Sequence, residues 1–438
     1  MKLLSRTLAA LSAALLLAAP PAHAGDACVE NSAASLEALT RGDFADARAH
    51  FNAAIGKQLD AARLKQAWTQ VQASAGAYGG HAASARQLLQ GEPAVVTPIT
   101  FAKMPLDLVT SCDAQGSIAH FRFLPAAMVT SVEPVKAQVE ADGVRVSPLD
   151  VPTPVGPLQG ALTMPVGRGP FPAVVLVAGS GAHDMDESIG PNKPFRDIAE
   201  GLARAGIASL RYDKRPFDYP RGWGGKDGPV IDAEVTDDAV AAVRLLAAQK
   251  VVDPRRVFVL GHSLGAMMAP RIGKRAPQLA GLILMAAPTR TLLSVLAQQI
   301  HDQNPQGPDK SALRDIEAIR NEQRLLAQVG PGLPPQGTFM RQPQSYWLSL
   351  HDYHQMAVAK SLSVPMLFLQ GDADFQVSPT LDFAQWKQGM AGRSNATFHL
   401  YPGLSHLFMP ANQTGDDYSK PSRVDPHVIG DIASWIKA

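Results

Sequence analysis

The feature that most constrains the fold is a regular alternation of short apolar strands and amphipathic helices after about residue 143. Residues 171–178 read FPAVVLVA, an unbroken apolar run typical of a strand buried on both faces of a parallel sheet. Residues 195–205 predict a helix that ends at Gly206, and residues 207–212 predict the next strand. The pattern recurs in strands at 257–260, 281–286, 365–370 and 397–401 and in helices at 237–249 and 428–436. Repeated strand–helix units predict an α/β fold with a doubly wound, mostly parallel sheet.

One segment, residues 291–356, interrupts this alternation. It contains helical patterns at residues 292–300 and 310–329 and a Pro- and Gly-rich connection at residues 330–337. Ligands bind at the carboxyl ends of the strands in sheets of this kind, and an insertion at this point would lie over those ends. We therefore predict that residues 291–356 form a helical cap.

The preceding part of the chain predicts a smaller, separate domain. Residues 31–90 have a helical spacing of apolar residues that is interrupted at Gly42 and Asp43, which predicts two helices joined by a turn. Strands rich in Val, Ile, Thr and Phe follow at 94–102, 106–111 and 116–123. Helices followed by strands form a small α+β unit. We expect domains at residues 25–138 and 139–438.

The first residues predict an export signal. Lys2 and Arg6 precede an apolar run at residues 8–19, and Ala22-His23-Ala24 follows as a small-x-small cleavage site. The run is too short to span a bilayer well, so an uncleaved anchor is the weaker alternative. We expect residues 1–24 to be removed after Ala24, leaving a periplasmic or extracellular protein without a membrane anchor.

Composition narrows the choice of partners. The 40 basic and 39 acidic side chains nearly cancel to a net charge of +1, so the chain has no long-range attraction for nucleic acid or anionic lipid. A small-molecule ligand in a pocket is the expectation that remains. Cys28 and Cys112, the two cysteines, could pair in an oxidising compartment, but two free thiols are an equal alternative. Neither cysteine spacing indicates a metal site.

A G-x-S-x-G motif, Gly261 to Gly265, follows the strand predicted at 257–260 and precedes an Ala- and Met-rich helix. This order of strand, tight turn and helix predicts a nucleophile elbow, whose glycines avoid a clash in the turn. The turn would expose the Ser263 hydroxyl at a helix N-terminus, where the dipole favours developing negative charge. The alternative is a glycine-rich turn with a buried serine.

A serine hydroxyl is a good nucleophile only when a base takes its proton, and two later segments supply a candidate base and a candidate acidic partner for that base. His406 follows the last predicted strand and is the expected general base, then the general acid for the leaving alcohol. Asp374 follows the strand at 365–370 and is the expected partner of the imidazole, with Asp372 as the rival. All of them follow the carboxyl ends of strands, so they should meet Ser263 at one edge of the sheet.

A tetrahedral intermediate also needs backbone donors. One is expected from Leu264, the residue after the serine, and the other from the turn Gly179-Ser180-Gly181 after the 171–178 strand. We favour the N–H of Ser180 over that of Gly181. The alternative is a plain tight turn.

Other conspicuous residues have structural interpretations. His183, Asp184, Asp186 and Glu187 predict a hydrogen-bonded loop or pocket rim, with metal binding as the weaker alternative. The segment Arg211 to Arg215 predicts structural ion pairs. Aromatic and histidine side chains at the end of the cap predict either pocket lining or the core of the cap, with equal weight. They are Tyr346, Trp347, His351, Tyr353 and His354.

Taken together, the motifs VLVAGSG, RYDKR, GHSLGA, PMLFLQGDADFQV and LSHLF resemble the bacterial EstD-type esterases of the α/β-hydrolase superfamily over about residues 143–438. The resemblance implies carboxylesterase activity on short acyl esters, no cofactor and an extracytoplasmic location. It implies Ser263, Asp374 and His406 as the catalytic triad and the N–H groups of Ser180 and Leu264 as oxyanion donors. Pro216 stands where that family usually has glycine, and a longer loop follows it. The resemblance therefore does not predict the pocket rim or the choice of substrate.

The amino-terminal part resembles the DUF3887 module, which is similar to small cystatin- or NTF2-like folds. The resemblance rests on the Gly42-Asp43-Phe44 turn, Phe51 and Trp68. It contains no catalytic constellation, and we interpret it as a docking or substrate-approach module.

Two other functions compete with that of a serine carboxylesterase. The same triad serves serine peptidases that act on small peptides, and an exported binding protein could retain the fold without the reaction. Dienelactone-type chemistry, which uses a cysteine nucleophile, is disfavoured by Ser263. Acyl length, alcohol preference and oligomeric state are not predicted by the sequence.

Overall fold

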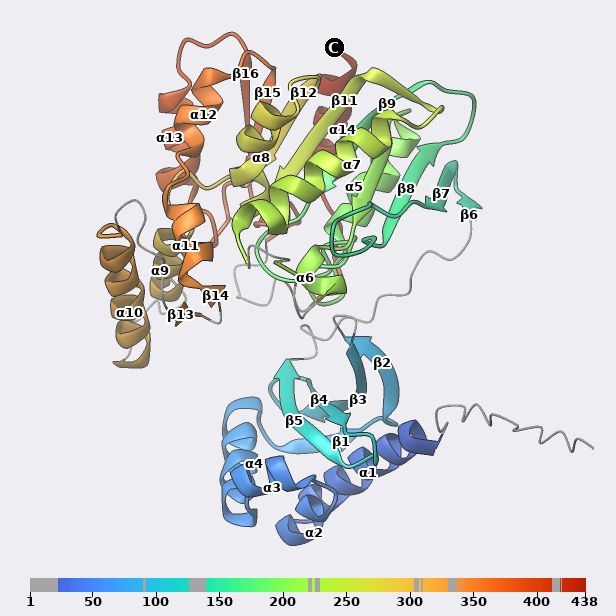
Figure 1. The fold of residues 1–438 in the computed structure, drawn as a ribbon, viewed down its shortest axis with the longest axis vertical. Coiled ribbons are helices and arrows are strands. Elements are labelled where there is room, and N and C mark those ends of the chain that lie inside the picture. The colour runs from blue at the N-terminus through green and yellow to red at the C-terminus, as the bar shows by residue number, and fades with distance from the viewer. Residues whose placement is uncertain are drawn as a thin grey trace, which may run out of the picture. The chain divides into compact units, whose positions relative to one another are not determined.

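The computed structural model describes residues 23–89, 92–125, 139–219, 223–224, 229–302, 307–308, 310–329, 337–340, 342–411, 418 and 420–438. They form two compact units, one made mainly of residues 23–125 and the other mainly of residues 139–438 (Figure 1), and each is described by itself. Most of the expected export signal, and the expected domain boundary at 138, lie outside the described residues. Within the described ranges, no helix has the length and apolar character needed to cross a membrane.

The amino-terminal unit packs helices on an antiparallel sheet. Strand β3 pairs with β1, β2 and β4, and β4 pairs with β5. Its core joins Leu36, Leu39 and Trp68 of the helices to Ile99 and Leu108 of the sheet. The elements are α1 (His23–Thr40), α2 (Phe44–Ala49), α3 (Ala53–Gln58), α4 (Ala61–Ala75), β1 (Tyr78–His81), β2 (Ala85–Leu89), β3 (Glu92–Phe101), β4 (Leu106–Cys112) and β5 (Ile118–Pro125).

The prediction of two helices over residues 31–90 was wrong in two respects. Four helices are present, because Asn52 and Asp60 cap the starts of α3 and α4 with their side chains and so divide the apolar pattern. The helical region also ends at Ala75, where Gly76 adopts a φ of +92°. The residues that follow pair as strands with β3 rather than continuing the helix.

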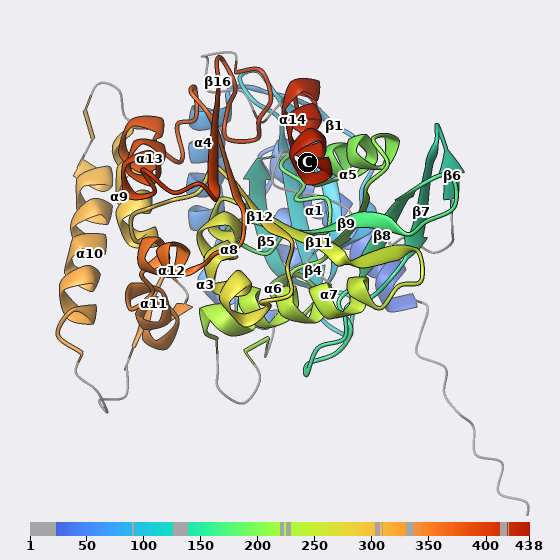
Figure 2. The same cartoon turned by 90° about the horizontal axis from the view of Figure 1, so that it is seen from above.

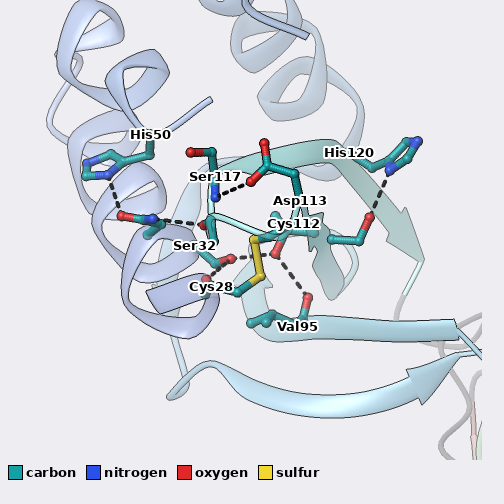
Figure 3. The surroundings of a disulfide bond; sticks show 12 residues. Cys28, Ser32, His50, Val95, Cys112, Asp113, Ser117 and His120 are labelled. Carbon is teal, nitrogen blue, oxygen red and sulfur yellow. Dashed lines mark hydrogen bonds between the residues drawn. A yellow bond between two sulfur atoms is a disulfide. The ribbon is translucent and has the colours of Figure 1, made fainter. Parts of the chain in front are cut away.

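A disulfide joins α1 to the end of β4 (Figure 3). The sulfur atoms of Cys28 and Cys112 are bonded, with their Cα atoms 5.8 Å apart. One helical turn further along, the Ser32 hydroxyl donates to the Cys28 carbonyl oxygen at 2.7 Å and lies 2.6 Å from the Thr110 hydroxyl. The pairing that the sequence left open is therefore formed, and it fixes the first helix to the sheet.

The carboxy-terminal unit contains a large sheet, which confirms the predicted α/β class. Strands β9, β10, β11, β12, β15 and β16 run parallel, and the β8, β7 and β6 edge is antiparallel. Across the described residues the order is β16-β15-β12-β11-β9-β10-β8-β7-β6. Their bounds are β6 (Val139–Ala141), β7 (Val144–Pro148), β8 (Gly160–Pro165), β9 (Phe171–Val177), β10 (Ala208–Tyr212), β11 (Val252–His262), β12 (Gly281–Met285), β15 (Met366–Gly371) and β16 (Ala396–Tyr401).

Helices cover both faces of this sheet (Figures 1 and 2). Helices α5 (Pro194–Arg204) and α14 (Pro426–Lys437) pack on one face, and α7 (Asp237–Ala247) and α8 (Leu264–Arg275) pack on the other. Strand β9 shows why its sequence is apolar throughout: Val175 and Val177 face the α7 and α8 layer, whereas Val174 and Leu176 face the α5 and α14 layer. Both sides of the strand are buried, as a parallel central strand requires.

The segment predicted as a cap is mostly helical where the structure describes it, with one short antiparallel strand pair, β13 and β14. Helix α10 packs against α9 and α11, and α12 packs against α8. Tyr346, Trp347 and Tyr353 are buried in the hydrophobic core, which favours the second of their two predicted roles. The remaining elements are α6 (Arg215–Asp218), α9 (Leu292–Asp302), α10 (Lys310–Leu326), β13 (Thr338–Phe339), β14 (Gln342–Pro343), α11 (Gln344–His351), α12 (Gln355–Ser361), α13 (Ala384–Gly389) and two π-helical turns (Asp232–Thr236 and Pro379–Phe383).

Candidate active site

Ser263 occupies the turn between β11 and α8. Its φ of +52° and ψ of −115° are strained for a residue with a side chain. The glycines around it are required by space: a Cβ on Gly265 would overlap the Val177 carbonyl oxygen, and one on Gly261 would overlap the backbone of Gly265. The turn therefore has the strand–turn–helix geometry predicted from the motif, with Ser263 at the N-cap of α8.

His406 and Asp374 form a buried pair beside this turn. The Nδ1 atom of His406 lies 2.8 Å from the Oδ2 atom of Asp374, and the side chains are 3% and 0% exposed. The preceding residue of the elbow, His262, contacts His406 directly: its Nε2 lies 2.9 Å from the His406 carbonyl oxygen, and the two rings are 4.6 Å apart. The segments that carry Ser263, Asp374 and His406 thus converge.

The two aspartates after β15 have different partners. The Oδ1 atom of Asp372 accepts the Gly403 N–H at 2.6 Å and braces the loop after β16. Asp374 instead accepts from the backbone N–H groups of Gln376 and Val377 with Oδ1, at 2.8 and 2.9 Å. Its Oδ2 accepts from the Gln370 side chain at 2.8 Å as well as facing His406. The carboxylate that faces the imidazole is therefore that of Asp374.

Glu187 connects three parts of the site. Its Oε1 accepts the Gly179 N–H at 2.6 Å and lies 2.9 Å from the Nδ1 atom of His262. Burial favours the neutral form of each partner, but the pair outweighs burial: the His262 imidazole lowers the pKa of Glu187, and the Glu187 carboxylate raises the pKa of His262. A charged pair thus ties the turn after β9 to the elbow and, through His262, to the His406 loop.

The turn at Gly179, Ser180 and Gly181 lies against the elbow. A Cβ on Gly179 would be 3.2 Å from the Cβ of Ser263. The Nζ atom of Lys214 donates to the Gly179 carbonyl oxygen at 2.6 Å, and the ring Nε2 of His183 is 2.8 Å from the Ser180 carbonyl oxygen. Ser180 itself is exposed. Leu264, the other expected donor, is the first residue of α8, where the N–H groups have no partner within the helix.

Several charged residues around the site form buried ion pairs. Arg211 bonds Asp186, Lys214 bonds Glu234 and Arg215 bonds Asp238, all buried. The prediction of ion pairs is confirmed for these residues, while Asp213 accepts the Met185 N–H instead. In the described part of the chain, no group of His, Cys, Asp and Glu has an arrangement that could hold a metal ion.

Sequence reasoning did not place the side chains of Glu187 and Lys214 against Gly179 in the turn after β9. Glu187 was predicted to lie in a hydrogen-bonded loop or pocket rim, and Lys214 to take part in structural ion pairs. The available signal was their charge: burying an ionised side chain is costly unless it is paired. Two charged residues in the loops after β9 and β10 therefore needed partners at the same edge of the sheet as Ser263.

The geometry combines the parts needed for acyl transfer. A hydroxyl at a strained turn, an imidazole hydrogen-bonded to a buried carboxylate and backbone N–H groups at a helix start all lie at the carboxyl ends of parallel strands. This combination is suited to a covalent, serine-based reaction.

Comparison with known proteins agrees with this architecture. The model of the alpha/beta hydrolase family matches residues 174–417, more than half of the 438 residues. The chain is 32% identical over 404 residues to esterase EstD of Thermotoga maritima, covering 91% of this chain and 92% of that protein.

Solved structures with similar folds include Est1E from Butyrivibrio proteoclasticus, with a TM-score of 0.42, 15% identity and coverage of 66% of this chain and 96% of that chain. They also include an esterase domain from a Rhodothermus marinus protein, with a TM-score of 0.40, 16% identity and coverage of 66% and 97%. On the family match and the identity to EstD, the chain belongs to the alpha/beta hydrolase family.

Proposed function

We propose that this protein is a serine carboxylesterase that hydrolyses short-chain carboxylic esters through an acyl-enzyme intermediate. Ser263 is the nucleophile, His406 the general base and Asp374 the residue that orients the imidazole. The N–H groups of Ser180 and Leu264 stabilise the oxyanion. The observation that carries the proposal is the buried His406–Asp374 hydrogen bond of 2.8 Å beside the strained elbow.

In the proposed reaction, the Ser263 oxygen attacks the ester carbonyl carbon while His406 takes the hydroxyl proton. The carbonyl oxygen becomes an oxyanion that accepts from the two backbone N–H groups. Collapse of this intermediate expels the alcohol, which receives the proton from His406. A water molecule, activated by the same imidazole, then attacks the acyl-enzyme and releases the carboxylic acid and free Ser263. No step uses a cofactor.

The relative named esterase EstD supports an ester substrate, because its identity to this chain extends over both units. A serine peptidase of small peptides is the competing activity. Rates on p-nitrophenyl butyrate and on aminoacyl anilides separate the two, since an amide nitrogen leaves only after it is protonated. We expect the ester rate to exceed the anilide rate by at least about 100-fold. Faster cleavage of the anilide would reverse the assignment.

We also propose that the protein is exported after cleavage behind Ala24 and acts in the periplasm or outside the cell. The Cys28–Cys112 disulfide supports this, since disulfides persist in oxidising compartments. The amino-terminal unit is proposed as a DUF3887-like docking or substrate-approach module, supported by its order of helices and then strands. Mass analysis of the mature chain from the periplasmic and culture fractions tests the cleavage site.

A further inference from the structure

The carbonyl oxygen of the peptide between Gly179 and Ser180 accepts a hydrogen bond from a buried ammonium group. Lys214 lies directly after β10 in the loop before α6, and its side chain is 4% exposed. Its Nζ atom donates to the Gly179 carbonyl oxygen at 2.6 Å and to the Glu234 Oε1 atom at 2.5 Å. The main chain of the lysine is fixed too, because its N–H donates to the His183 carbonyl oxygen at 2.9 Å.

The orientation of the Ser180 N–H follows from this contact. The Gly179 carbonyl and the Ser180 N–H belong to one planar peptide unit, which is trans. In a trans peptide the carbonyl and the N–H point in opposite directions. With the carbonyl oxygen fixed on the Lys214 ammonium, the Ser180 N–H must point away from Lys214.

The neighbouring peptides of the turn are fixed as well. Glu187 accepts the Gly179 N–H at 2.6 Å, and the His183 ring binds the Ser180 carbonyl oxygen at 2.8 Å. Gly179 itself lies against Ser263, since a Cβ added to it would be 3.2 Å from the serine Cβ. The turn is therefore locked beside the nucleophile, with the lysine on the side opposite to the Ser180 N–H.

The contact also changes the donor strength of the peptide. A charged donor on a carbonyl oxygen makes a stronger hydrogen bond than a neutral one and polarises the whole amide. The polarised amide N–H is a better donor to an oxyanion. Glu234 balances the lysine charge at a second hydrogen-bonding position of the ammonium, so Lys214 satisfies a charged partner and the turn at the same time.

We propose that Lys214 is a positioning residue that orients and polarises the Ser180 N–H as an oxyanion donor. The inference rests on the proposed function, because it assigns a catalytic use to that N–H. Lys214 does not touch the substrate. Its loss should therefore lower kcat and weaken binding of oxyanion mimics while the KM for the ester changes little.

The experiment compares two double variants that each remove one buried ion pair, and the two cations are neighbours in the sequence. K214M/E234Q removes the lysine together with the Glu234 carboxylate, which would otherwise stay buried without its cation. R215M/D238N is the matched control, because Arg215 and Asp238 form a neighbouring buried pair without a contact to the turn among the described hydrogen bonds. Values of kcat and KM on p-nitrophenyl butyrate and Ki for an alkyl trifluoromethyl ketone are measured for both and for the wild type.

We expect K214M/E234Q to lose about 10- to 100-fold in kcat, since one complete donor is worth about 100- to 1,000-fold. Its ketone Ki should rise by a similar factor, because the ketone adduct carries an oxyanion. The control should stay within about threefold of the wild type in both quantities. Equal kcat in the two double variants, or a loss of kcat without a rise in Ki, would overturn the inference.

Failure of the inference is distinguishable from failure of the proposed function. If the wild type hydrolyses the ester but K214M/E234Q matches the control, the role of Lys214 is refuted and the esterase stands. If the folded wild type cleaves no ester and the ketone does not bind, both fall. Circular dichroism of each variant establishes that the compared proteins are folded, and the single variant K214M provides a second test if the double variant does not fold.

Discussion

Replacing Asp374 by Asn separates the two aspartates after β15 by function. The side chain of Asp374 is fully buried and accepts from Gln370, Gln376, Val377 and His406. In the variant, the amide oxygen can take the Oδ1 position and keep both backbone donors. The amide NH₂ group then replaces Oδ2 and faces the His406 Nδ1 atom. The imidazole must accept there, so its proton moves to Nε2, and it can no longer take a proton from Ser263.

The wrong tautomer should lower kcat by about 10⁴-fold. This corresponds to about 5.4 kcal/mol in the activation free energy. The matched control is D372N, because the Asp372 Oδ1 atom accepts only the Gly403 N–H at the loop edge in the described hydrogen bonds. An amide oxygen can still accept that N–H, so D372N should keep kcat within about tenfold. Initial rates on p-nitrophenyl butyrate measure both. A greater loss in D372N than in D374N would refute the assignment of the acid.

Three further predictions concern the disulfide, a buried carboxyl group and the elbow. The C28S/C112S variant opens a loop with a sequence separation of 84, so urea titration should show the amino-terminal unit destabilised by about 4–5 kcal/mol, with kcat unchanged. Burial and the neighbouring Asp218 carboxyl raise the pKa of Asp213 to about 9, so the free energy of unfolding falls as pH rises from about 4 towards 9. The urea midpoint should therefore fall less with rising pH in D213N than in the wild type. The same pH dependence of the midpoint in both proteins would contradict this. The Cβ of G265A would overlap the Val177 carbonyl oxygen, so the free energy of unfolding of this variant, measured by thermal melts, should drop by about 2–3 kcal/mol. In G430A the Cβ meets nothing within 4 Å, so the same measurement should show a neutral or stabilising effect.

The sequence predicted the large sheet well because its signals are local. The apolar run of β9, the glycine after α5 and the G-x-S-x-G turn each report the burial or backbone conformation of their own residues. The order of the site segments along the chain then places them at one sheet edge, because parallel strands end on the same side. The Ser263 turn and the His406–Asp374 pair follow from that topology.

Features that depend on distant partners were less accessible. Residues 78–89 follow a helix and carry few strand signals of their own, and they become strands because β3 offers an edge. The choice between Asp374 and Asp372 depends on which oxygen meets His406 and which meets Gly403, a matter of a two-residue loop offset. Lys214 contacts Gly179 across a sequence separation of 35 residues, and Glu187 contacts it across 8 residues within one loop. No local pattern of apolar or turn residues predicts these contacts.

The most direct test of the central claim is labelling with a fluorophosphonate, which reacts with a serine only when its hydroxyl is activated. Intact mass measurement should show one adduct per chain, and peptide mapping should locate it on Ser263. The adduct should be absent in S263A and strongly slowed in H406A. A folded wild-type protein that takes up no label, or takes it up at another residue with equal rate in S263A, would contradict the proposed nucleophile.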